Sequence, residues 1–284
     1  MNEKRENHRL SDSNPIPPVV LAASGLDPTG SAGLIADIRV IAALGCHPCG
    51  VITCETVQSS RGLTHIRPSE PGLLEEQLLA LVEDLPIRAV KIGAVASVEV
   101  IEVLARILRK MPETPVVLDP VFAPTVGPAF LDLDGMRAMS MHLLPHTLIA
   151  TPNAKELGTP AGLEVDPSNG EMILGCADGW FGTGVKSLLV TGLVLDGRMV
   201  DRFFRSSGGQ EIITTDITHP RHDVGEVHGT GCVLSSAIAA FLAKGEQLAS
   251  AVERAVEFTC SMIGSARKLG EGAAFGIERK GYGC

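Results

Sequence analysis

Short runs of aliphatic residues alternate along the chain with longer segments in which apolar side chains recur every three or four positions. The short runs are typical of buried strands and cover residues 19–23, 51–57, 90–95, 116–118, 148–150 and 188–190. The longer segments predict helices over residues 32–44, 71–83, 98–108, 136–144 and 168–180, from 232 onward, and over 248–269. Strand and helix in repeated alternation predict an α/β fold with a central, mostly parallel sheet and helices on both faces.

The last strands of the pattern differ from the rest. Residues 199–204 and 211–216 alternate between apolar and polar side chains, and Ser-Ser-Gly-Gly follows the first of them, which predicts a β-hairpin. The chain has no internal repeat and no linker-like stretch, so we expect one α/β domain over residues 18–284. Residues 1–17 are polar and rich in turn formers, and they predict a flexible tail.

Composition narrows the class of protein. Apolar residues make up 45% of the 284 positions and charged residues 20%, and the net charge is −9 with a pI near 5.4. A protein this acidic is not expected to bind nucleic acid or a membrane surface. No apolar run approaches the roughly 20 residues of a membrane span, and the first residues lack the apolar core of a signal peptide. We therefore expect a cytoplasmic protein.

The seven cysteines are scattered and odd in number, so we expect reduced thiols. Cys46 and Cys49 form a CxxC pair, which occurs in zinc and redox sites. Zinc needs two further ligands at a matching spacing, and the chain has no second CxxC and no HxxxH. We interpret the pair as a coincidence at the start of a strand.

The strongest chemical signal is a glycine-rich turn that leads into an apolar helix. Gly229, Thr230 and Gly231 precede Cys232 and the helical run. A helix that begins this way presents unpaired N–H groups at the positive end of its dipole, where phosphate binds. A tight turn before a core helix has the same sequence, so this motif alone does not decide between the two interpretations.

Polar residues collect at the ends of the predicted strands, where open α/β sheets bind ligands. They are Asp27, Glu55, Gln58, Asp119, Asn153, Glu156, Thr191 and the turn at 229–232. Each has a local alternative: Asp27 closes a turn, Asp119 ends a strand, and Asn153 caps a helix. Their joint occurrence at successive strand ends favours a shared ligand site.

Phosphoryl transfer fits this set of groups. The reaction needs a cradle for anionic oxygens, carboxylates or amides that hold Mg²⁺, and a pocket that aligns an acceptor hydroxyl. Asp119 and Glu156 are the candidate metal ligands, and Asn153 lies three residues before Glu156. The chain has neither GxxxxGK[ST] nor GxGxxG after a strand, so it is not a P-loop or Rossmann protein.

Six motifs in order resemble one family. They are SGLDPTGSAGLIADI, ALGCHPCGVITCETVQSSRG, VKIGAVA, VVLDPV, TPNAKE and HGTGC, and the match to which they belong runs from about residue 19 to residue 269. Together they resemble the hydroxymethylpyrimidine/phosphomethylpyrimidine kinases of thiamine biosynthesis, which belong to the ribokinase-like superfamily.

The resemblance implies ATP- and Mg²⁺-dependent phosphorylation of 4-amino-5-hydroxymethyl-2-methylpyrimidine, its monophosphate, or both, by a homodimer. It places the pyrimidine among Gly25, Asp37, Gln58 and Val121. The nucleotide is placed at Asn153, Thr191 and Gly192 and at the glycines of the turn, Gly229 and Gly231. Cys232 stands where many relatives carry an aspartate base, and a thiol at a helix N-terminus is expected to be more acidic than usual.

Three departures from the family pattern leave alternatives open. Where the family has a KSG stretch, this chain has Pro124 to Gly127. Where the family has KGG, this chain has residues 191–193, and Ala94 stands in place of the family's methionine after KIG. Two cationic phosphate partners are therefore missing. A pyridoxal or pyridoxine kinase, and a catalytically weak sensor of a pyrimidine, remain as alternatives.

Overall fold

The structure is a computed structural model that describes residues 16–124, 126–206, 212–220, 227–272 and 274–275. Its strands are β1 (Val19–Leu26), β2 (His47–Ser59), β3 (Gly62–Pro68), β4 (Ile87–Ile92), β5 (Val116–Leu118), β6 (Ile149–Ala150), β7 (Ser187–Leu195), β8 (Arg198–Ser206), β9 (Ile212–His219), β10 (Val227–His228) and β11 (Ala274–Phe275). Its α-helices are α1 (Gly33–Ala43), α2 (Pro71–Asp84), α3 (Val98–Leu108), α4 (Leu133–His142), α5 (Ala154–Gly158), α6 (Gly170–Phe181), α7 (Thr230–Ala243) and α8 (Leu248–Gly264). Short 3₁₀ turns lie at Leu144–His146 and Thr159–Ala161.

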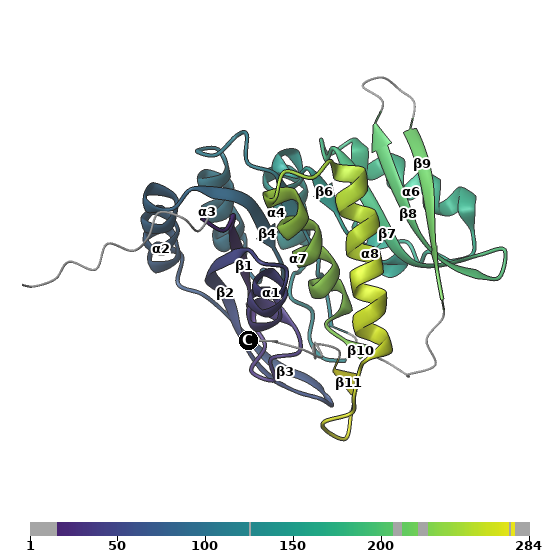
Figure 1. The fold of residues 1–284 in the computed structure, drawn as a ribbon, viewed down its shortest axis with the longest axis horizontal. Helices are drawn as coiled ribbons and strands as arrows, with labels where there is room; N and C mark the ends of the chain where they lie inside the picture. The colour runs from purple at the N-terminus through teal and green to yellow at the C-terminus, as the bar shows by residue number, and fades with distance from the viewer. Residues whose placement is uncertain (1–15, 125, 207–211, 221–226, 273, 276–284) are drawn as a thin grey trace, which may run out of the picture.

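Nine of the described strands form one sheet in the order β3-β2-β1-β4-β5-β6-β7-β8-β9. The six strands in the middle of this order, β2-β1-β4-β5-β6-β7, run parallel. β3 at one edge, and β8 and β9 at the other, are antiparallel to their neighbours. Figure 1 shows β8 and β9 as a ribbon at the far end from α2. The predicted mostly parallel sheet is confirmed. The carboxyl ends of the parallel strands all face one edge of the sheet.

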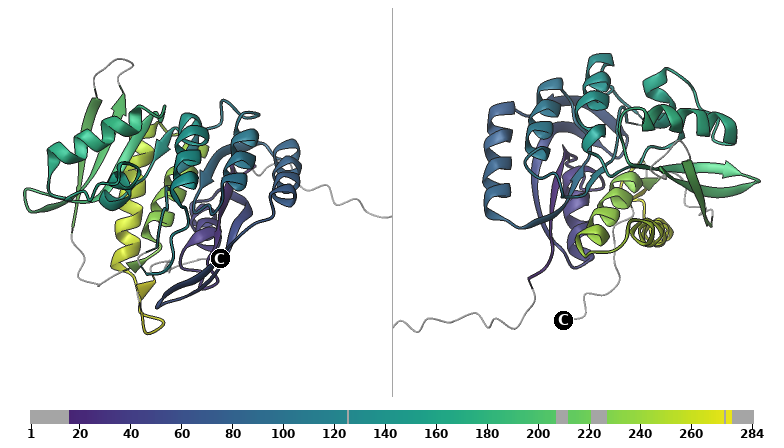
Figure 2. Two further views of the ribbon diagram at one scale, coloured as in Figure 1. Left: turned by 180° about the vertical axis from the view of Figure 1, so that it is seen from behind. Right: turned by 90° about the horizontal axis from the view of Figure 1, so that it is seen from above.

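Helices cover both faces of this sheet, as predicted. Alternate side chains of a strand point to opposite faces, and in β1 Leu21 packs into one core while Val20 packs into the other. The first core is completed by α2, α3, α4 and α6, and the second by α1, α7 and α8. The view from above in Figure 2 shows the two helical layers with the sheet between them.

The second core explains why α7 is apolar around its whole circumference. Every residue from Val233 to Phe241 is buried, because α7 lies between the sheet and the other two helices of its layer. In Figure 1, α7 and α8 lie side by side across the sheet. The helix that begins at the glycine turn is therefore fixed along its length, and its N-terminus is held in place.

Several elements differ from the sequence prediction, and the two-residue strands β10 and β11 were also not predicted. β7 was expected to end before Thr191 but continues to Leu195, through an irregularity in its pairing with β8 between Val190 and Leu193. β3 was missed because it is a half-exposed edge strand without an aliphatic run. α5 was missed because five residues are too short to show a helical period.

Several boundaries also shift. The strand expected over 90–95 is Ile87–Ile92, the helix expected over 136–144 begins at Leu133, and α8 ends at Gly264 rather than at 269. The hairpin of β8 and β9 is present, but residues 207–211 between its strands lie outside the described residues. So does the predicted tail, apart from residues 16 and 17.

The CxxC pair does not form a site. The Cys46 thiol donates to the Ala240 carbonyl at 3.5 Å, and the Cys49 thiol to the Val20 carbonyl at 3.7 Å. Within the described ranges no cluster of three metal-ligating side chains occurs. Both cysteines are free thiols, as expected. The described helices are also all too short or too polar to cross a membrane.

Candidate active site

A cavity of about 280 Å³ opens at the carboxyl ends of the parallel strands. Segments that follow β1, β5 and β6 contribute Asp27, Asp119, Thr151, Asn153 and Glu156 to its lining. Gln58 comes from β2, Thr191 from β7, and the turn at the start of α7 supplies residues 228–232. The polar residues predicted from separate strand ends are therefore brought together, with the exception of Glu55, which is exposed and outside the cavity.

The glycine turn lines the cavity at the N-terminus of α7. Gly229 is the N-cap of α7 and adopts φ 82°, a left-handed conformation that favours glycine. A β-carbon on it would overlap the carbonyl oxygen of Ser31. No side chain caps this helix, so its first N–H groups are available to an anionic ligand.

Two carboxylates face this turn. Asp119 follows β5, and Ser235 of α7 lies 3.4 Å from its Oδ2. Burial and the nearby Asp37 raise the pKa of Asp119 above its ordinary value, although the Lys91 ammonium opposes that shift. Burial and the charge of Asp119 raise the pKa of Glu156 to about 8. The two carboxylates therefore oppose one another's ionisation, and a cation between them would relieve that repulsion.

The donor set fits Mg²⁺. Magnesium prefers oxygen ligands and is usually held by one or two carboxylates together with substrate phosphates and water. Thr151, which is 3% exposed and lines the same cavity, has a hydroxyl with no hydrogen-bond partner, and it is the one such buried side-chain N or O atom in the part of the chain that the structure describes. An orphaned buried hydroxyl beside two carboxylates is consistent with a missing ligand.

Asn153 and Glu156 are held rigidly. The Asn153 carboxamide accepts the Glu156 N–H at 2.9 Å, and the Glu156 carboxylate accepts the Asn153 N–H at 2.9 Å. This capping box starts α5. The local interpretation of Asn153 as a helix cap is thus correct, and the same cap fixes the Glu156 carboxylate at the cavity.

The cavity lining also includes Gly25, Gln58 and Val121, three of the four predicted substrate contacts. Gly25 has no room for a side chain, because a β-carbon there would stand 2.9 Å from the Cys54 sulfur. Ala94 lines the same cavity, where the family pattern has a methionine.

Asp37, the fourth predicted substrate contact, lies apart from the other three in the structure. Its side chain is fully buried in α1 and is not part of the cavity. Lys91 donates to both of its carboxylate oxygens at 2.8 Å, and Ser236 of α7 donates to Oδ1 at 2.8 Å. Asp37 therefore joins α1, β4 and α7 beneath the site. Burial lowers the pKa of Lys91, but the attraction of Asp37, together with that of the other acidic groups around it, outweighs burial and the net shift is upward.

The acidity of the Cys232 thiol also differs from the sequence prediction. We expected the helix N-terminus to make its thiol more acidic, but burial together with Asp37 and Asp119 raises its pKa to about 12. Lys91 lowers the value only in part. The thiol is therefore protonated at neutral pH, and the idea of a resting thiolate is wrong for this structure.

Thr191 lines the cavity, whereas Gly192 does not. The Gly192 N–H donates to the buried Asp201 carboxylate at 3.0 Å, and the residue adopts φ 72°. Asn153 and Thr191 are joined by a parallel bridge between their backbones. The expected nucleotide contact at Gly192 is thus turned away from the lining surface.

His228, Thr151 and Lys91 were not predicted as site residues, although each belongs to one of the six motifs. His228 stands directly before the glycine turn, and its ring contacts Gln58 and Asp27. The motifs contain all three residues but do not single them out. Only their burial and contacts in the structure distinguish them from the other residues of those motifs.

Within the described residues, no lysine or arginine lines the cavity. Its ionisable groups are Asp27, Asp119, Glu156, His228 and the Cys232 thiol. Whether cations reach the bound phosphates from outside this lining stays a prediction.

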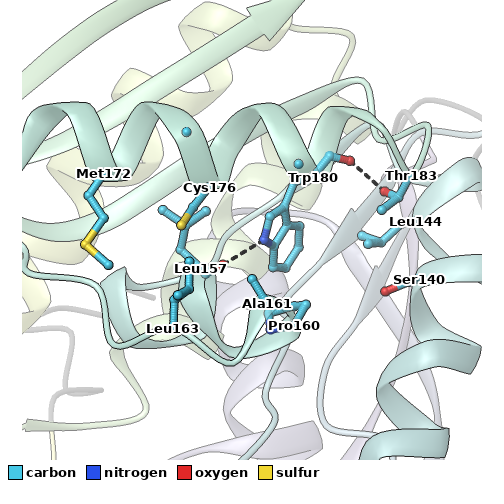
Figure 3. A pocket seen from close by; sticks show the side chains of 12 residues that line it. Ser140, Leu144, Leu157, Pro160, Ala161, Leu163, Met172, Cys176, Trp180 and Thr183 are labelled. Carbon is cyan, nitrogen blue, oxygen red and sulfur yellow. Dashed lines mark hydrogen bonds between the residues drawn. The ribbon is translucent and has the colours of Figure 1, made fainter.

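A second cavity, of about 430 Å³, lies between α4, α5 and α6 and shares no lining residue with the first. Figure 3 shows the Trp180 indole donating to the Leu157 carbonyl, at 2.9 Å, with Met172, Cys176 and Leu163 nearby. This cavity is larger, but its lining has no charged residue and few polar groups. It lacks the groups needed for phosphoryl transfer.

The fold and the first cavity define the class of protein as a ribokinase-like phosphotransferase. The family model for phosphomethylpyrimidine kinase matches residues 27–276. A hydroxymethylpyrimidine/phosphomethylpyrimidine kinase of Streptomyces coelicolor is 34% identical over 90% of this chain and 92% of its own length. The chain belongs to the phosphomethylpyrimidine kinase family and is a phosphotransferase, so the resemblance found in the sequence is confirmed.

Solved structures agree with the fold. The phosphomethylpyrimidine kinase of Clostridium difficile has a TM-score of 0.71 and 29% identity, covering 85% of this chain and 97% of that one. The pyridoxal kinase of Staphylococcus aureus in complex with AMP-PCP has a TM-score of 0.75 and 25% identity, covering 91% and 92%. The predicted fold class is confirmed.

Proposed function

We propose that the protein transfers the γ-phosphoryl group of ATP, with Mg²⁺, to the hydroxymethyl group of 4-amino-5-hydroxymethyl-2-methylpyrimidine, its monophosphate, or both. The observation that carries this proposal is one cavity whose lining includes both an uncapped helix N-terminus and a side-chain amide. The N-terminus of α7 suits phosphate, and the amide of Gln58 suits an aminopyrimidine.

The acidic residues define where the metal would bind. Mg²⁺ would neutralise phosphate charge at Asp119 and Glu156, in a cavity that supplies no lysine or arginine from the described residues. The capping box of α5 holds Glu156 in position, and the Thr151 hydroxyl offers a further donor or acceptor to a metal-bound water or a phosphate oxygen.

The chain's own residues would orient the alcohol. Gln58 would pair with the ring nitrogen and the exocyclic amine, and Gly25 and Val121 would contact the ring. The hydroxymethyl oxygen would then lie toward Cys232 and the amides of the turn. Because the thiol is protonated at neutral pH, Cys232 would align the hydroxyl rather than act as a resting base. A loose phosphoryl-transfer transition state depends more on alignment than on deprotonation.

The names of the relatives support the choice of substrate. The Streptomyces and Clostridium proteins are named as kinases of hydroxymethylpyrimidine or phosphomethylpyrimidine, and the Staphylococcus structure contains an ATP analogue. Pyridoxal kinase is the rival, because it shares the fold. A coupled ADP-release assay on the pyrimidine alcohol, its monophosphate and pyridoxal tests the proposal. A preference for pyridoxal of more than about tenfold in kcat/KM, about 1.4 kcal/mol, would overturn it.

The absence of lysine and arginine from the described lining favours one second candidate, a sensor that binds the pyrimidine without phosphorylating it. Calorimetry and the same turnover assay separate the two. Tight pyrimidine binding without ADP release supports the sensor, and ordinary turnover excludes it.

We further propose that residues 18–284 act as one kinase domain and that the protein works in the cytoplasm. The free thiols among the described cysteines support a reducing compartment.

We also propose that the protein is a homodimer. Sedimentation equilibrium tests the dimer, and a purely monomeric protein at micromolar concentration would contradict it.

A further inference from the structure

The His228 ring contacts two polar side chains of the cavity lining, Gln58 and Asp27. His228 is the last residue of β10, whose backbone pairs with Phe275 of β11, and it directly precedes Gly229. Its side chain is about one-third exposed and lines the cavity. Its Nε2 atom lies 2.7 Å from the Gln58 amide nitrogen and 3.4 Å from Oδ2 of Asp27.

One ring nitrogen cannot donate to Asp27 and accept from Gln58 at the same time. Asp27 has little need of a further donor. Its Oδ2 already accepts from the Thr29 hydroxyl at 2.8 Å, from the Ala32 N–H at 3.0 Å and from the Ser31 hydroxyl at 3.2 Å. The contact with Gln58 is much shorter, and an amide nitrogen can only donate. Nε2 is therefore the acceptor, and the His228 proton is on Nδ1.

With the His228 proton on Nδ1, the observed orientation of the Gln58 amide is the one that His228 stabilises. One N–H goes to His228, and the carbonyl oxygen lies 3.4 Å from the Thr56 hydroxyl. The amide keeps one N–H and part of its carbonyl capacity for a ligand. If Nε2 carried a proton instead, the carbonyl would turn toward His228, and the donor and acceptor of Gln58 would exchange places.

The order of donor and acceptor on Gln58 matters because the substrate ring cannot be flipped in the site. Its hydroxymethyl group has to reach the turn at the start of α7, so the ring edge that meets Gln58 is fixed. We infer that His228 is a positioning residue that locks the Gln58 amide in the order required by a ring nitrogen next to an exocyclic amine, and thereby selects aminopyrimidines over their oxo counterparts. This inference rests on the proposed function.

The kinetic test compares two alcohols that differ at one ring position, the 4-amino compound and its 4-oxo analogue, which reverses the donor and acceptor order. Wild-type protein should prefer the amino compound in kcat/KM. In His228→Leu the amide is released, and in His228→Gln either orientation has a partner. We expect the amino-to-oxo preference to fall by about tenfold or more in both variants, with KM for ATP within about twofold of wild type.

A purely structural role for His228 would lower kcat/KM for both alcohols in parallel and leave their ratio unchanged, and that result would overturn the inference. The matched control is His65→Leu, because His65 is an exposed residue of β3 outside the cavity. It should change neither the ratio nor the rate.

A second measurement does not depend on turnover. Nitrogen-15 NMR of labelled histidine, with the His228 signals assigned by their loss in His228→Gln, should find Nε2 unprotonated near pH 7.5. A proton on Nε2 there would overturn the inference. If wild-type protein phosphorylates neither pyrimidine, the proposed function fails, and the NMR result still decides the state of His228.

Discussion

The carboxylate of Asp119 lies 3.4 Å from the point that a β-carbon on Gly231 would occupy. That distance is an ordinary van der Waals contact, so the fold can accept an alanine at 231. The added methyl group would nevertheless stand between Asp119 and the first turn of α7, where phosphate and metal are proposed to meet.

Gly231→Ala should therefore keep the melting temperature of wild type but weaken nucleotide binding by about tenfold or more, because backbone approach is blocked. Gly229→Ala is the comparison: its left-handed φ and its overlap with the Ser31 carbonyl predict a clearly lower melting temperature. Thermal melts and calorimetry with an ATP analogue measure both. Nucleotide affinity at the wild-type level in Gly231→Ala would contradict the proposed cradle.

Glu156 predicts an unusual dependence of stability on pH. Its pKa is raised to about 8 by burial and by Asp119, against an ordinary value of 4.5. Between these values the folded protein binds more protons than the unfolded chain, so stability without metal should fall as pH rises from about 5 to 8. Mg²⁺ should restore it most at the upper end of that range, because binding needs the ionised carboxylate.

Melting curves from pH 5 to 8.5, with and without Mg²⁺, test this. Glu156→Gln is the matched variant, since glutamine also completes a capping box. We expect it to flatten the fall in stability and to lose most of the Mg²⁺ effect. Equal Mg²⁺ stabilisation in this variant and in wild type would place the metal elsewhere.

Replacing Thr151 tests whether its hydroxyl binds a ligand or only supports the fold. Its buried hydroxyl has no partner in the protein, so Thr151→Val should not lower stability and should raise it slightly. If the hydroxyl serves a phosphate or a metal-bound water, kcat/KM for ATP should fall by about tenfold.

The control is Thr147→Val, because the Thr147 hydroxyl is also buried but donates to the Leu143 carbonyl at 2.9 Å. That variant should lose about 1 kcal/mol of stability and keep its kinetics. Unchanged kinetics in Thr151→Val would remove the hydroxyl from the site.

The buried pair of Lys91 and Asp37 predicts strong coupling between α1 and β4. Both side chains are fully buried, and Lys91→Met would leave Asp37 as an uncompensated charge or force it to bind a proton. We expect this variant to lose roughly 3–5 kcal/mol of stability.

The double variant Lys91→Met with Asp37→Asn should recover most of that loss, because asparagine still accepts from Ser236. Urea unfolding of the two single variants and the double variant measures the coupling. Additive losses would mean that the two residues act independently.

The architecture was largely predictable because strands buried on both faces read as unbroken aliphatic runs. Polar residues at their carboxyl ends then pointed to one edge of the sheet. The predictions failed where packing overrides a local rule. Thr191 and Gly192 resemble the end of a strand, but pairing with β8 carries β7 past them to Leu195.

Burial and charge were the hardest properties to predict. Asp37 belongs to a motif of the site, and nothing in its neighbours reveals that a lysine from another strand neutralises it beneath the cavity. The same holds for Cys232, because a helix N-terminus is visible in the sequence while two nearby carboxylates are not. Such effects depend on residues distant in the chain.

The Cys232 thiol has a raised pKa of about 12, and this value changes what its replacement should do. Its backbone N–H belongs to the first turn of α7 and survives any substitution. A protonated thiol that only aligns the hydroxyl can be replaced in part by serine, which also offers a donor and an acceptor. We expect Cys232→Ser to retain a large part of kcat and Cys232→Ala to lose about tenfold, with KM for ATP nearly unchanged in both. Cys232→Asp should not restore activity, because Asp37 and Asp119 already oppose a negative charge there.

The measurement is kcat against pH from 6 to 9.5 for wild type and the three variants, each with its melting temperature. A loss of about 10²-fold in both Cys232→Ala and Cys232→Ser, the usual scale for a positioned general base, would instead mean that the thiol gives up its proton during the reaction.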